Sequence, residues 1–431
     1  MKTQSRYRWF VVGIFFVFML LHQCDKLLIG PLTTPIMEQF KISHTQMGLV
    51  STGALIVGAI CYPLWGYFYD RFARAKLLAL ASFIWGATTW LSAIAPTYRT
   101  FTMTRASTGI DDSSYPGLYS MVSDYFMPQV RGKIYGLLEL TMPVGYLLGM
   151  ILGLFLGGVV GWRGVFYITG SLGILLSVVI FFGVREPERG RSEPELAGRA
   201  GISPHRFEFR KAVELFRKRS LLFLFGQGFV GVFPWNVITF WFFAYLETER
   251  GYDSNAILLT MAPAVLVLSA GYFVGGSLGD AAFRRTRRGR LLVSMVGVLM
   301  GAVLLTFTLR VPHDDRSTFM MLLLATAVFI PFASPNVVST IYDITVPEVR
   351  STALALQYFI EDAGSALAPL LAGFIADHSS LEYAILVICV TAWLIGAALL
   401  AGAAFHVPKD MDVLRGQMRE RAGTVSRPGA A

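Results

Sequence analysis

The sequence DYFMPQVR at residues 124–131 has an echo, DITVPEVR, at residues 343–350. Both copies start with aspartate, carry a proline in fifth place, end in Val-Arg and follow a long apolar run. They lie 219 residues apart in a chain of 431 residues. A second pair, GYFYDRFARAK at residues 66–76 and GGSLGDAAFRRTRRGR at residues 275–290, has nearly the same offset. Two echoes at nearly one offset predict a chain built from a duplicated unit.

The composition indicates a protein of the lipid bilayer. Hydrophobic residues make up 54% of the chain, charged residues only 15%, and the mean hydropathy is +0.56. An average soluble domain has about 25% charged residues, so an ordinary water-soluble globule is excluded. The formal net charge is +9, but the basic residues lie in loops between apolar runs and form no basic face. We therefore expect the bilayer as a partner and no nucleic acid.

A membrane-spanning helix needs about 20 mostly apolar residues, and the chain has twelve such runs. Six precede and six follow a basic, apolar-poor segment at residues 185–219. This predicts an all-α membrane protein with twelve transmembrane helices in two six-helix halves. The runs cover residues 9–29, 48–69, 76–95, 103–125, 133–159, 164–184, 220–246, 255–278, 290–309, 318–340, 352–376 and 382–405.

The distribution of basic residues predicts the orientation. Most of the 37 Lys and Arg residues fall in the termini and in alternate loops, which the positive-inside rule places in the cytoplasm. We therefore expect a multi-pass protein of the inner (plasma) membrane with both termini cytoplasmic. The expected parts are a cytoplasmic amino terminus at 1–8, the first half at 9–184, a cytoplasmic linker at 185–219, the second half at 220–405 and a cytoplasmic tail at 406–431.

Nothing in the sequence indicates an enzyme. The three cysteines lie inside apolar runs, and the six histidines show no metal-ligand spacing. A phosphate-cradling GxxxxGK[ST] motif is missing, so ATP is not the expected driver. We expect no cofactor and no metal. Duplicated membrane halves are typical of transporters, whose energy here should come from an ion gradient. An intramembrane enzyme would need clustered catalytic groups, and a signalling or scaffold protein would not need polar side chains at depth.

A small set of charged side chains falls within the apolar runs. Each costs about 2.5–3.5 kcal/mol on insertion scales, so such residues persist mainly where they face a cavity or one another. The set comprises Asp25, Lys26, Arg105, Asp111, Asp112, Glu139, Glu361 and Asp362.

The fourth run carries a polar stripe. Arg105, Thr108, Asp112, Tyr115 and Tyr119 are spaced 3, 4, 3 and 4 residues apart, which places them on one face of a helix. We expect this face to line a central cavity, with Arg105, Tyr115 and Tyr119 contacting substrate.

The first and fourth runs together suggest proton coupling. We expect Lys26 to pair with Asp111 or Asp112, while Asp25 or Asp112 takes up a proton. Burial favours the protonated carboxyl and a neighbouring cation favours the ionised one, so a cavity that opens to either side would switch protonation. The alternative is a fixed ion pair that only holds the two helices together.

Two later runs offer further candidate substrate contacts. Glu361 and Asp362 lie near the middle of the run 352–376. We expect one of them to contact a cation or a proton. The alternative is a neutral carboxyl that is hydrogen-bonded to backbone. Trp235 and Asn236 lie in the run 220–246 beside a proline. We expect both residues to line the cavity. The alternative is that the Trp235 ring is part of ordinary core packing.

Asp70 is a candidate latch. It follows the run 48–69, at the end where the run 352–376 should begin. A carboxylate there is favoured by the positive end of the helix dipole, by about 0.3–1 kcal/mol, whereas the alternative is a solvated turn. We expect a charge network of Asp70 with Arg71, Arg74 and Arg131. Asp280 would be the weaker counterpart in the second half, against the run 133–159.

The stretch GYFYDRFARAK resembles the signature of the major facilitator superfamily, which has a glycine, then Asp-Arg, then spaced basic residues between its second and third helices. Within that superfamily the chain most resembles the spinster-like branch. The residues that carry this second resemblance are Asp25 with Lys26, Asp112 with Ser114 and Tyr115, VREPERG at 184–190, ALQ at 355–357 and GFIAD at 373–377.

The sequence also departs from that branch. Its first-helix pair is Asp25-Lys26, where the branch usually has Asp-Arg. Its fourth helix has Asp111-Asp112, where the branch usually has glutamate after glycine. The stretch GWRGVFYITG at residues 161–170 is equally similar to the organic-anion branch of the superfamily.

We expect a monomeric, proton-coupled secondary transporter that works by alternating access. The resemblance implies that Gly66 permits close helix contact and that Asp70 latches the cytoplasmic side shut. The spinster-like branch implies a lysophospholipid or related amphipathic lipid as cargo. The alternative cargo is a small organic anion, for which Lys26 and Arg105 would be the counter-charges.

Overall fold

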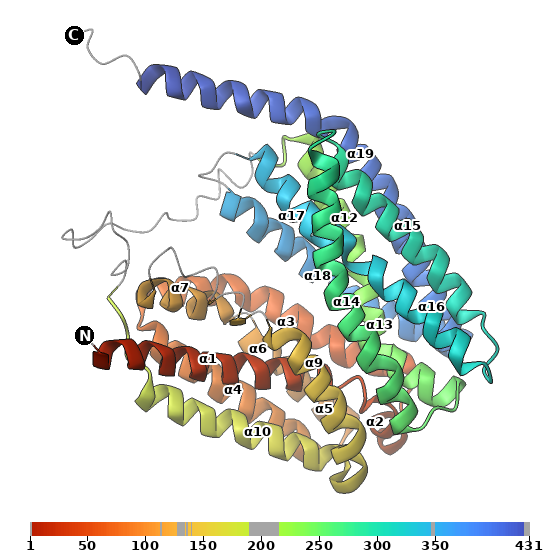
Figure 1. Cartoon of the computed structure of the whole chain (residues 1–431). Coiled ribbons are helices and arrows are strands. Elements are labelled where there is room, and N and C mark those ends of the chain that lie inside the picture. Colours follow the sequence, from red (N-terminus) through yellow and green to blue (C-terminus); the bar gives the residue numbers. More distant parts are fainter. Residues whose placement is uncertain are drawn as a thin grey trace. The chain divides into compact units, whose positions relative to one another are not determined.

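The computed structural model describes residues 2–112, 114–126, 134, 137–138, 140–188, 215–345 and 350–425. Within these ranges every regular element is a helix, as Figure 1 shows. The expected all-α fold is thereby confirmed for the described residues.

The helices of the amino-terminal part run in order from α1 to α10 (Figure 1). They are α1 (Lys2–Leu28), α2 (Thr33–Phe40), α3 (His44–Arg71), α4 (Arg74–Ile94), α5 (Tyr98–Ser107), α6 (Gly109–Asp112), α7 (Tyr115–Tyr125), α9 (Thr141–Ile151), η1 (Leu152–Leu156) and α10 (Gly157–Gly183).

The carboxy-terminal part continues from α12 to α19. Its helices are α12 (Arg219–Gly231), α13 (Phe233–Ala244), η3 (Tyr245–Glu249), α14 (Ser254–Phe283), α15 (Gly289–Leu309), α16 (Arg316–Phe329), η4 (Ile330–Phe332), α17 (Ala333–Ile344), α18 (Arg350–His378) and α19 (Leu381–Val425).

Ten described stretches are long and apolar enough to cross a membrane. The stretch Thr141–Gly183 covers two of the predicted runs, because Gly161 leaves the helical conformation with φ 70° and ψ 164°. A positive φ of this kind favours glycine. The predicted run 103–125 corresponds to α5, α6 and α7 in succession. Each of the twelve predicted runs therefore matches helical structure in the described part of the chain.

The predicted single helix at 103–125 is broken, and local side chains explain the break. Ser107 and Thr108 turn their hydroxyls back onto the carbonyls of Thr104 and Arg105, each at 2.7 Å, which competes with continued helical bonding. Gly109 then packs so closely on α3 that a Cβ would lie 2.0 Å from the Ala54 carbonyl oxygen.

The chain divides into two compact units. The first comprises Met1–His205, Asn236–Leu259 and Ala366–Ala384, and the second comprises Arg206–Trp235, Thr260–Ser365 and Ile385–Ala431.

The core of the first unit lies between α1, α4, α7 and α10. Phe15, Phe18, Trp85 and Leu118 are fully or almost fully buried in it, and Figure 1 shows α1, α4 and α10 side by side. Gly86 lets α4 and α10 touch, since a Cβ there would lie 2.5 Å from the backbone nitrogen of Ile174. Such close helix contact through small residues is characteristic of membrane bundles.

The second unit has a comparable contact. Gly275 and Gly279 of α14 pack against Phe332 and Asn336. Asn336 Nδ2 donates to the carbonyl oxygens of Gly275 at 3.0 Å and Phe332 at 2.9 Å. The amide joins α14 to α17 just after the short helix that contains Pro331, where a proline removes a backbone donor.

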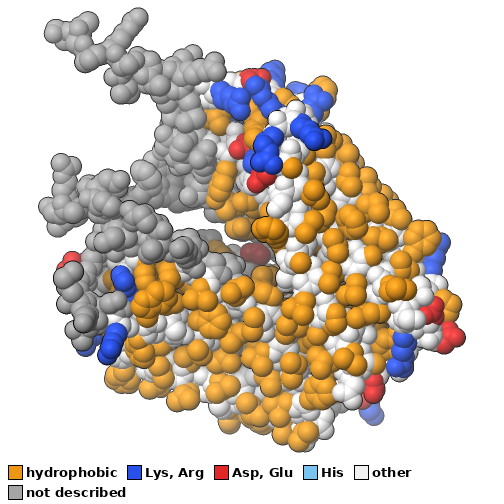
Figure 2. Space-filling model, viewed as in Figure 1, with side chains coloured by type: hydrophobic (Ala, Val, Ile, Leu, Met, Phe, Trp, Pro, Cys, Tyr) orange, Lys and Arg blue, Asp and Glu red, His pale blue; other side chains and the backbone are white. Residues whose placement is uncertain are grey.

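Large apolar side chains are exposed over much of the surface. Val159, Phe182 and Phe273 are each about four-fifths exposed, at 82%, 80% and 79%. Apolar side chains cover most of the face seen in Figure 2, and charged side chains gather near its margins. Water would not tolerate patches of this extent on a monomer, whereas lipid would, so these helix faces contact the bilayer.

Candidate functional site

A small cavity of about 60 Å³ lies inside the first unit. It is large enough for a few water molecules. Apolar side chains of α3, among them Val50, Ala54 and Leu55, form one wall. The polar and charged lining comes from α1, α3, α5, α6 and the residue between the last two, and it comprises His22, Asp25, Lys26, Ser51, Arg105, Thr108 and Asp111.

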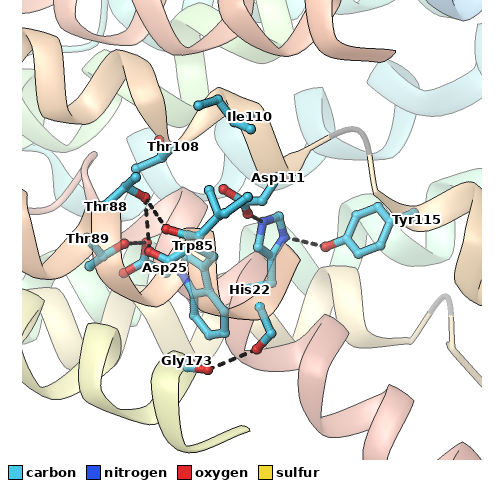
Figure 3. A network of polar contacts seen from close by, with 12 residues as sticks. His22, Asp25, Trp85, Thr88, Thr89, Thr108, Ile110, Asp111, Tyr115 and Gly173 are labelled. Atoms are coloured by element: carbon cyan, nitrogen blue, oxygen red, sulfur yellow. Dashed lines mark hydrogen bonds and ion pairs between the residues drawn. The ribbon is translucent and has the colours of Figure 1, made fainter. Parts of the chain in front are cut away.

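Asp25 is held by hydroxyl groups and an arginine. Its Oδ1 accepts from Thr169 at 2.6 Å and its Oδ2 from Thr89 at 3.0 Å, as Figure 3 shows for Thr89. Arg105 Nη1 lies 3.7 Å from Oδ2. The carboxyl is almost fully buried, with 2% of the residue exposed. Charges buried in this way require pairing and hydrogen bonds, and three helices supply them here.

Arg105 reaches this site from α5. It is buried, and its guanidinium lies 5.2 Å from the centre of the Phe166 ring. The ring face attracts the cation, which holds Arg105 close to Asp25. The sequence predicted Arg105 as an intramembrane cation but did not predict its partner.

His22 joins two elements of the fourth-helix region. Its Nε2 lies 2.6 Å from Oδ2 of Asp111 and its Nδ1 lies 2.5 Å from the hydroxyl of Tyr115, as Figure 3 shows. The ring also stacks on Phe18 and meets Trp85 edge-on, with centroids 5.8 Å and 5.5 Å away. His22 was not among the predicted site residues, although its spacing of three from Asp25 puts both on one helix face.

Part of the predicted polar stripe lies at this cavity, and its contact with substrate stays a prediction. Arg105 and Thr108 line the cavity, and Tyr115 reaches His22. Asp111 also lines the cavity; it lies three residues after Thr108 and four before Tyr115, so it shares their helix face. The side chain of Asp112 lies outside the described residues. Tyr119 is half-buried against the core of the first unit.

Lys26 also lines the cavity, with an exposed side chain. Its pairing with Asp111 or Asp112 stays a prediction. Glu139 lies outside the described residues.

The remaining predicted substrate contacts are spread over α13 and α18. Glu361 accepts from Nε2 of Gln357 at 2.8 Å, and Gly228 of α12 packs against both side chains. Asp362 is half-buried. These residues, with half-buried Trp235 and Asn236, are not part of the cavity lining within the described chain, so their contact with substrate stays a prediction.

Arg74 forms the centre of a buried ion network. Its Nη1 lies 2.6 Å from Oδ2 of Asp124, and its Nε donates to Oε1 of Glu186 at 2.7 Å. Glu186 also accepts from the backbone N–H of Ala75 at 2.9 Å, which caps the first turn of α4. The network ties α4, α7 and the segment after α10 together. The sequence predicted Arg74 in a network but predicted neither acid.

The other predicted gating residues of the first half are less fully described. The guanidinium of Arg71 lies 4.6 Å from the centre of the Tyr67 ring. The surroundings of Gly66 and the side chain of Asp70 are outside the described part of the structure, and so is Arg131. The predicted network of Asp70 with the three arginines is therefore not tested here.

The second unit repeats the arginine arrangement. Arg290, at the start of α15, contacts Asp343 at the end of α17, and its Nη2 donates to Oδ1 of Asp280 at 2.7 Å. Arg74 and Asp124 stand at the corresponding ends of α4 and α7. The two ion pairs thus express the duplication that the paired sequences predicted. Arg290 is thus a described partner of Asp280, and the expected position of Asp280 against the run 133–159 stays a prediction.

Lys218 lies near this second ion network. Its Nζ donates to the carbonyl oxygen of Ile344 at 2.6 Å. Burial lowers the pKa of the Lys218 ammonium, and Asp410 opposes that effect. Lys218 satisfies a carbonyl at the end of α17, where a cation is favoured by the helix dipole.

Asp377, at the end of α18, caps the beginning of α3. Its carboxylate accepts from the backbone N–H groups of His44 at 2.8 Å and Thr45 at 2.9 Å, and from the Thr45 hydroxyl at 2.5 Å. His44 Nδ1 lies 3.0 Å from the same carboxylate. Ser43 adds a capping box at the same helix start. The sequence motif GFIAD contained Asp377, but its partner was not predicted.

Close backbone packing accompanies this cap within the first unit. Thr52 donates to the Ala366 carbonyl oxygen at 2.6 Å, and Trp241 Nε1 donates to that of Pro369 at 3.0 Å. A Cβ at Gly48 would lie 2.5 Å from the Pro369 oxygen. The first half of α3 therefore packs closely against the last half of α18. It also contacts α13 through the rings of His44 and Trp241.

A helical bundle with lipid-facing apolar side chains and charged groups around an internal cavity defines a multi-pass membrane protein. A model of the Major Facilitator Superfamily matches residues 14–314 and 285–426. The chain belongs to that family of membrane transporters, which confirms the resemblance carried by residues 66–76.

Relatives place the chain near the spinster proteins. It is 27% identical over 397 residues to protein spinster of Drosophila melanogaster, covering 88% of this chain and 63% of the fly protein, less than two thirds of that relative's length. It is 24% identical to the sphingosine-1-phosphate transporter SPNS2 of Xenopus tropicalis, over 87% of this chain and 76% of that protein. A solved bacterial homologue of the human lysosomal transporter spinster matches with a TM-score of 0.81 at 20% identity, covering 94% of this chain and 98% of that one. The last match concerns the fold.

Proposed function

We propose that this chain is a proton-coupled secondary transporter that works by alternating access and carries a lysophospholipid or related amphipathic lipid with an anionic head group. The observation that carries the proposal is the buried cavity in which Asp25 and Arg105 face each other and His22 meets Asp111. Titratable groups inside a membrane bundle are characteristic of ion-coupled carriers. The similarity to a sphingosine-1-phosphate transporter supports a lipid-like cargo.

Three of the predicted roles form part of this proposal. Asp25, Asp111 and Asp112 serve proton coupling. Lys26 and Arg105 hold the anionic head group. The remaining substrate contacts are Tyr115, Tyr119, Trp235, Asn236, Glu361 and Asp362.

Alternating access requires contacts that form and break at the two membrane faces. The cap that Asp377 places on α3 is such a contact at one end of that helix. At the other end of α3, Asp70 would latch the beginning of α18. The pairs Arg74–Asp124 and Arg290–Asp343 stiffen the same end within each half. Opening at one face would then accompany closure at the other.

The proposed orientation follows from the basic residues. Both termini and the linker 185–219 lie in the cytoplasm, and the protein resides in the plasma membrane as a monomer. The two functional halves comprise residues 9–184 and 220–405. With this orientation, the Asp377 cap closes the outer face.

The first experiment identifies the cargo and the driving force. Purified protein would be tested for thermal stabilisation by a panel of lysolipids and small organic anions, and each stabilising compound would be tested for uptake into proteoliposomes with and without a pH gradient. The proposal predicts stabilisation by lysolipids and uptake that requires the gradient. Stabilisation by organic anions alone would overturn the lipid cargo, and uptake independent of pH would overturn the proton coupling.

A small organic anion is the second candidate cargo. The described cavity is small, about 60 Å³, and two cationic side chains line it. Arg105 and Lys26 suit a carboxylate as well as a phosphate. The same panel distinguishes the two candidates, because an acyl chain stabilises through apolar contact and a short anion does not.

A further inference from the structure

We propose that His22, acting with Asp111 and Tyr115, is the group that binds and releases the coupled proton. This inference rests on the proposed proton coupling and names the residue that performs it. His22 lies within the first unit, and every contact used below lies there too.

Both ring nitrogens of His22 are engaged. The Asp111 carboxylate, as an anion, only accepts hydrogen bonds, so the Nε2 atom at 2.6 Å carries the hydrogen. In the neutral ring, Nδ1 then accepts a hydrogen bond from the Tyr115 hydroxyl at 2.5 Å. The pair therefore selects one tautomer and leaves Nδ1 as the position where a proton binds.

Tyr115 allows the proton to bind without displacing the ring. A phenol hydroxyl both donates and accepts, so it can donate to neutral Nδ1 or accept from Nδ1–H of the imidazolium. The Gln23 amide, 3.4 Å from the same hydroxyl oxygen, donates to it in either state. Proton uptake converts the neutral ring to the imidazolium at Nδ1, and release reverses the step with no other bond changed.

Asp25 is less suited to this role. Its two oxygens accept from Thr169 and Thr89, and Arg105 lies beside it. Both of its oxygens are therefore already occupied by hydroxyl donors, and a cation stands beside one of them. His22 instead has an anion on one side and a reversible hydroxyl on the other. Histidine is also the side chain whose ordinary proton affinity lies within the physiological range.

The surrounding charges link the proton to the cargo. The charged groups around His22 are Asp25 and Lys26 on its own helix, Arg105 on α5 and Asp111 on α6, and Tyr115 on α7 is the titratable contact. On α4, the neighbour of His22 is the uncharged Trp85. The charges of the two described carboxylates and the two described cations cancel. Protonation of His22 therefore makes the net charge of these cavity groups positive. A protonated cavity attracts an anionic head group, and deprotonation favours its release.

The first test separates proton movement from cargo binding. His22→Gln keeps a side chain that can bond to Asp111 and Tyr115 but cannot take up a proton, and His22→Asn provides a second variant in case of poor folding. His406→Gln on α19 is the matched control, since His406 stacks on Phe223 in the second unit. Proteoliposomes would be assayed for pH-gradient-driven uptake and for exchange of labelled against unlabelled lysophospholipid.

The expected result is selective. His22→Gln should reduce gradient-driven uptake to the level of protein-free vesicles and retain exchange, which moves no net proton. His406→Gln should retain both activities. Gradient-driven uptake that persists in His22→Gln, or loss of exchange together with uptake, would overturn the role of His22. An unmodified protein without pH-dependent uptake would instead contradict the proposed function.

A second measurement needs no cargo. The Trp85 ring lies against His22, so protonation of His22 should change Trp85 fluorescence between about pH 5 and pH 8. The Trp85 signal would be taken as the difference between the unmodified protein and Trp85→Phe. We expect a titration in the unmodified protein and in His406→Gln, and its loss in His22→Gln. A flat signal in the unmodified protein, or one that persists in His22→Gln, would overturn the inference even if transport is proton-coupled.

Discussion

The carboxylate of Asp377 accepts a hydrogen bond from the backbone N–H of His44 at 2.8 Å, although the two residues lie 333 positions apart in the chain. The bond joins the end of α18 to the start of α3. A helix start attracts negative charge, so the contact combines geometry with electrostatics. It is the clearest described contact that an opening movement at this end of α3 would have to break.

Asp377→Asn should weaken this closure. The amide keeps one acceptor but loses the charge, and the partly exposed bonds lose about 1 kcal/mol, which changes the ratio of closed to open forms several-fold. Spin labels at the exposed positions Glu38 and Ser379 would report longer distances. Asp314→Asn, an exposed carboxylate elsewhere, is the control. Identical distance distributions for Asp377→Asn and the unmodified protein would refute the closing role of the Asp377 cap.

Arg74→Ala should destabilise the fold more than Arg290→Ala. Arg74 and Asp124 have 3% and 8% of their side chains exposed, whereas Arg290 has 16% exposed and its partners Asp343 and Asp280 have 29% and 61%. Removing one partner of a buried ion pair costs about 3–5 kcal/mol, and an exposed pair contributes much less. Thermal unfolding in detergent would show the larger loss for Arg74→Ala. Equal shifts for the two variants would contradict the burial argument.

Gly86→Ala should loosen the contact of α4 with α10. The new methyl group would meet the Ile174 backbone nitrogen at 2.5 Å, and overpacking of this kind costs about 1–3 kcal/mol. Gly13→Ala is the matched control, because no atom lies within 4 Å of the added Cβ. Unfolding temperatures of the two variants should differ, with only Gly86→Ala below the unmodified protein. A comparable loss in both would contradict the packing argument, because helix propensity alone favours alanine over glycine at both positions.

Arg105→Gln should impair cargo binding. It removes the cation beside Asp25 and leaves a buried carboxylate without its charge partner. Binding of an anionic ligand should weaken while binding of a neutral lipid of the same chain length changes little. Microscale binding assays with both ligands would separate the two effects. Equal weakening for the two ligands would mean that the substitution acts through the fold.

Much of the fold was predictable because apolar runs and repeated motifs can be read directly from the sequence. The same holds for Asp25, Lys26, Arg105 and Asp111, since charges are rare within apolar runs and converge on cavities. They meet in one cavity, as the stripe and the first run together suggested.

The specific partners were not predictable in the same way. Glu186 lies 112 residues from Arg74 and Asp377 lies 333 residues from His44. Such pairs depend on how helices rotate and pack, which a single sequence does not state. The break of the helix after α5 was not predictable from the apolar pattern, because it depends on the hydroxyl contacts of Ser107 and Thr108 and on the close packing of Gly109. His22 was passed over because a single histidine on an apolar helix carries no distinctive pattern.

The central claim is that cargo movement is coupled to protons through this cavity. The most direct measurement is lysophospholipid uptake by proteoliposomes under an imposed pH gradient, for the unmodified protein and for Asp25→Asn, Asp111→Asn and Asp112→Asn. The account predicts uptake that depends on the gradient in the unmodified protein and is lost when these carboxylates are neutralised. Full gradient-dependent uptake in all three variants would contradict it.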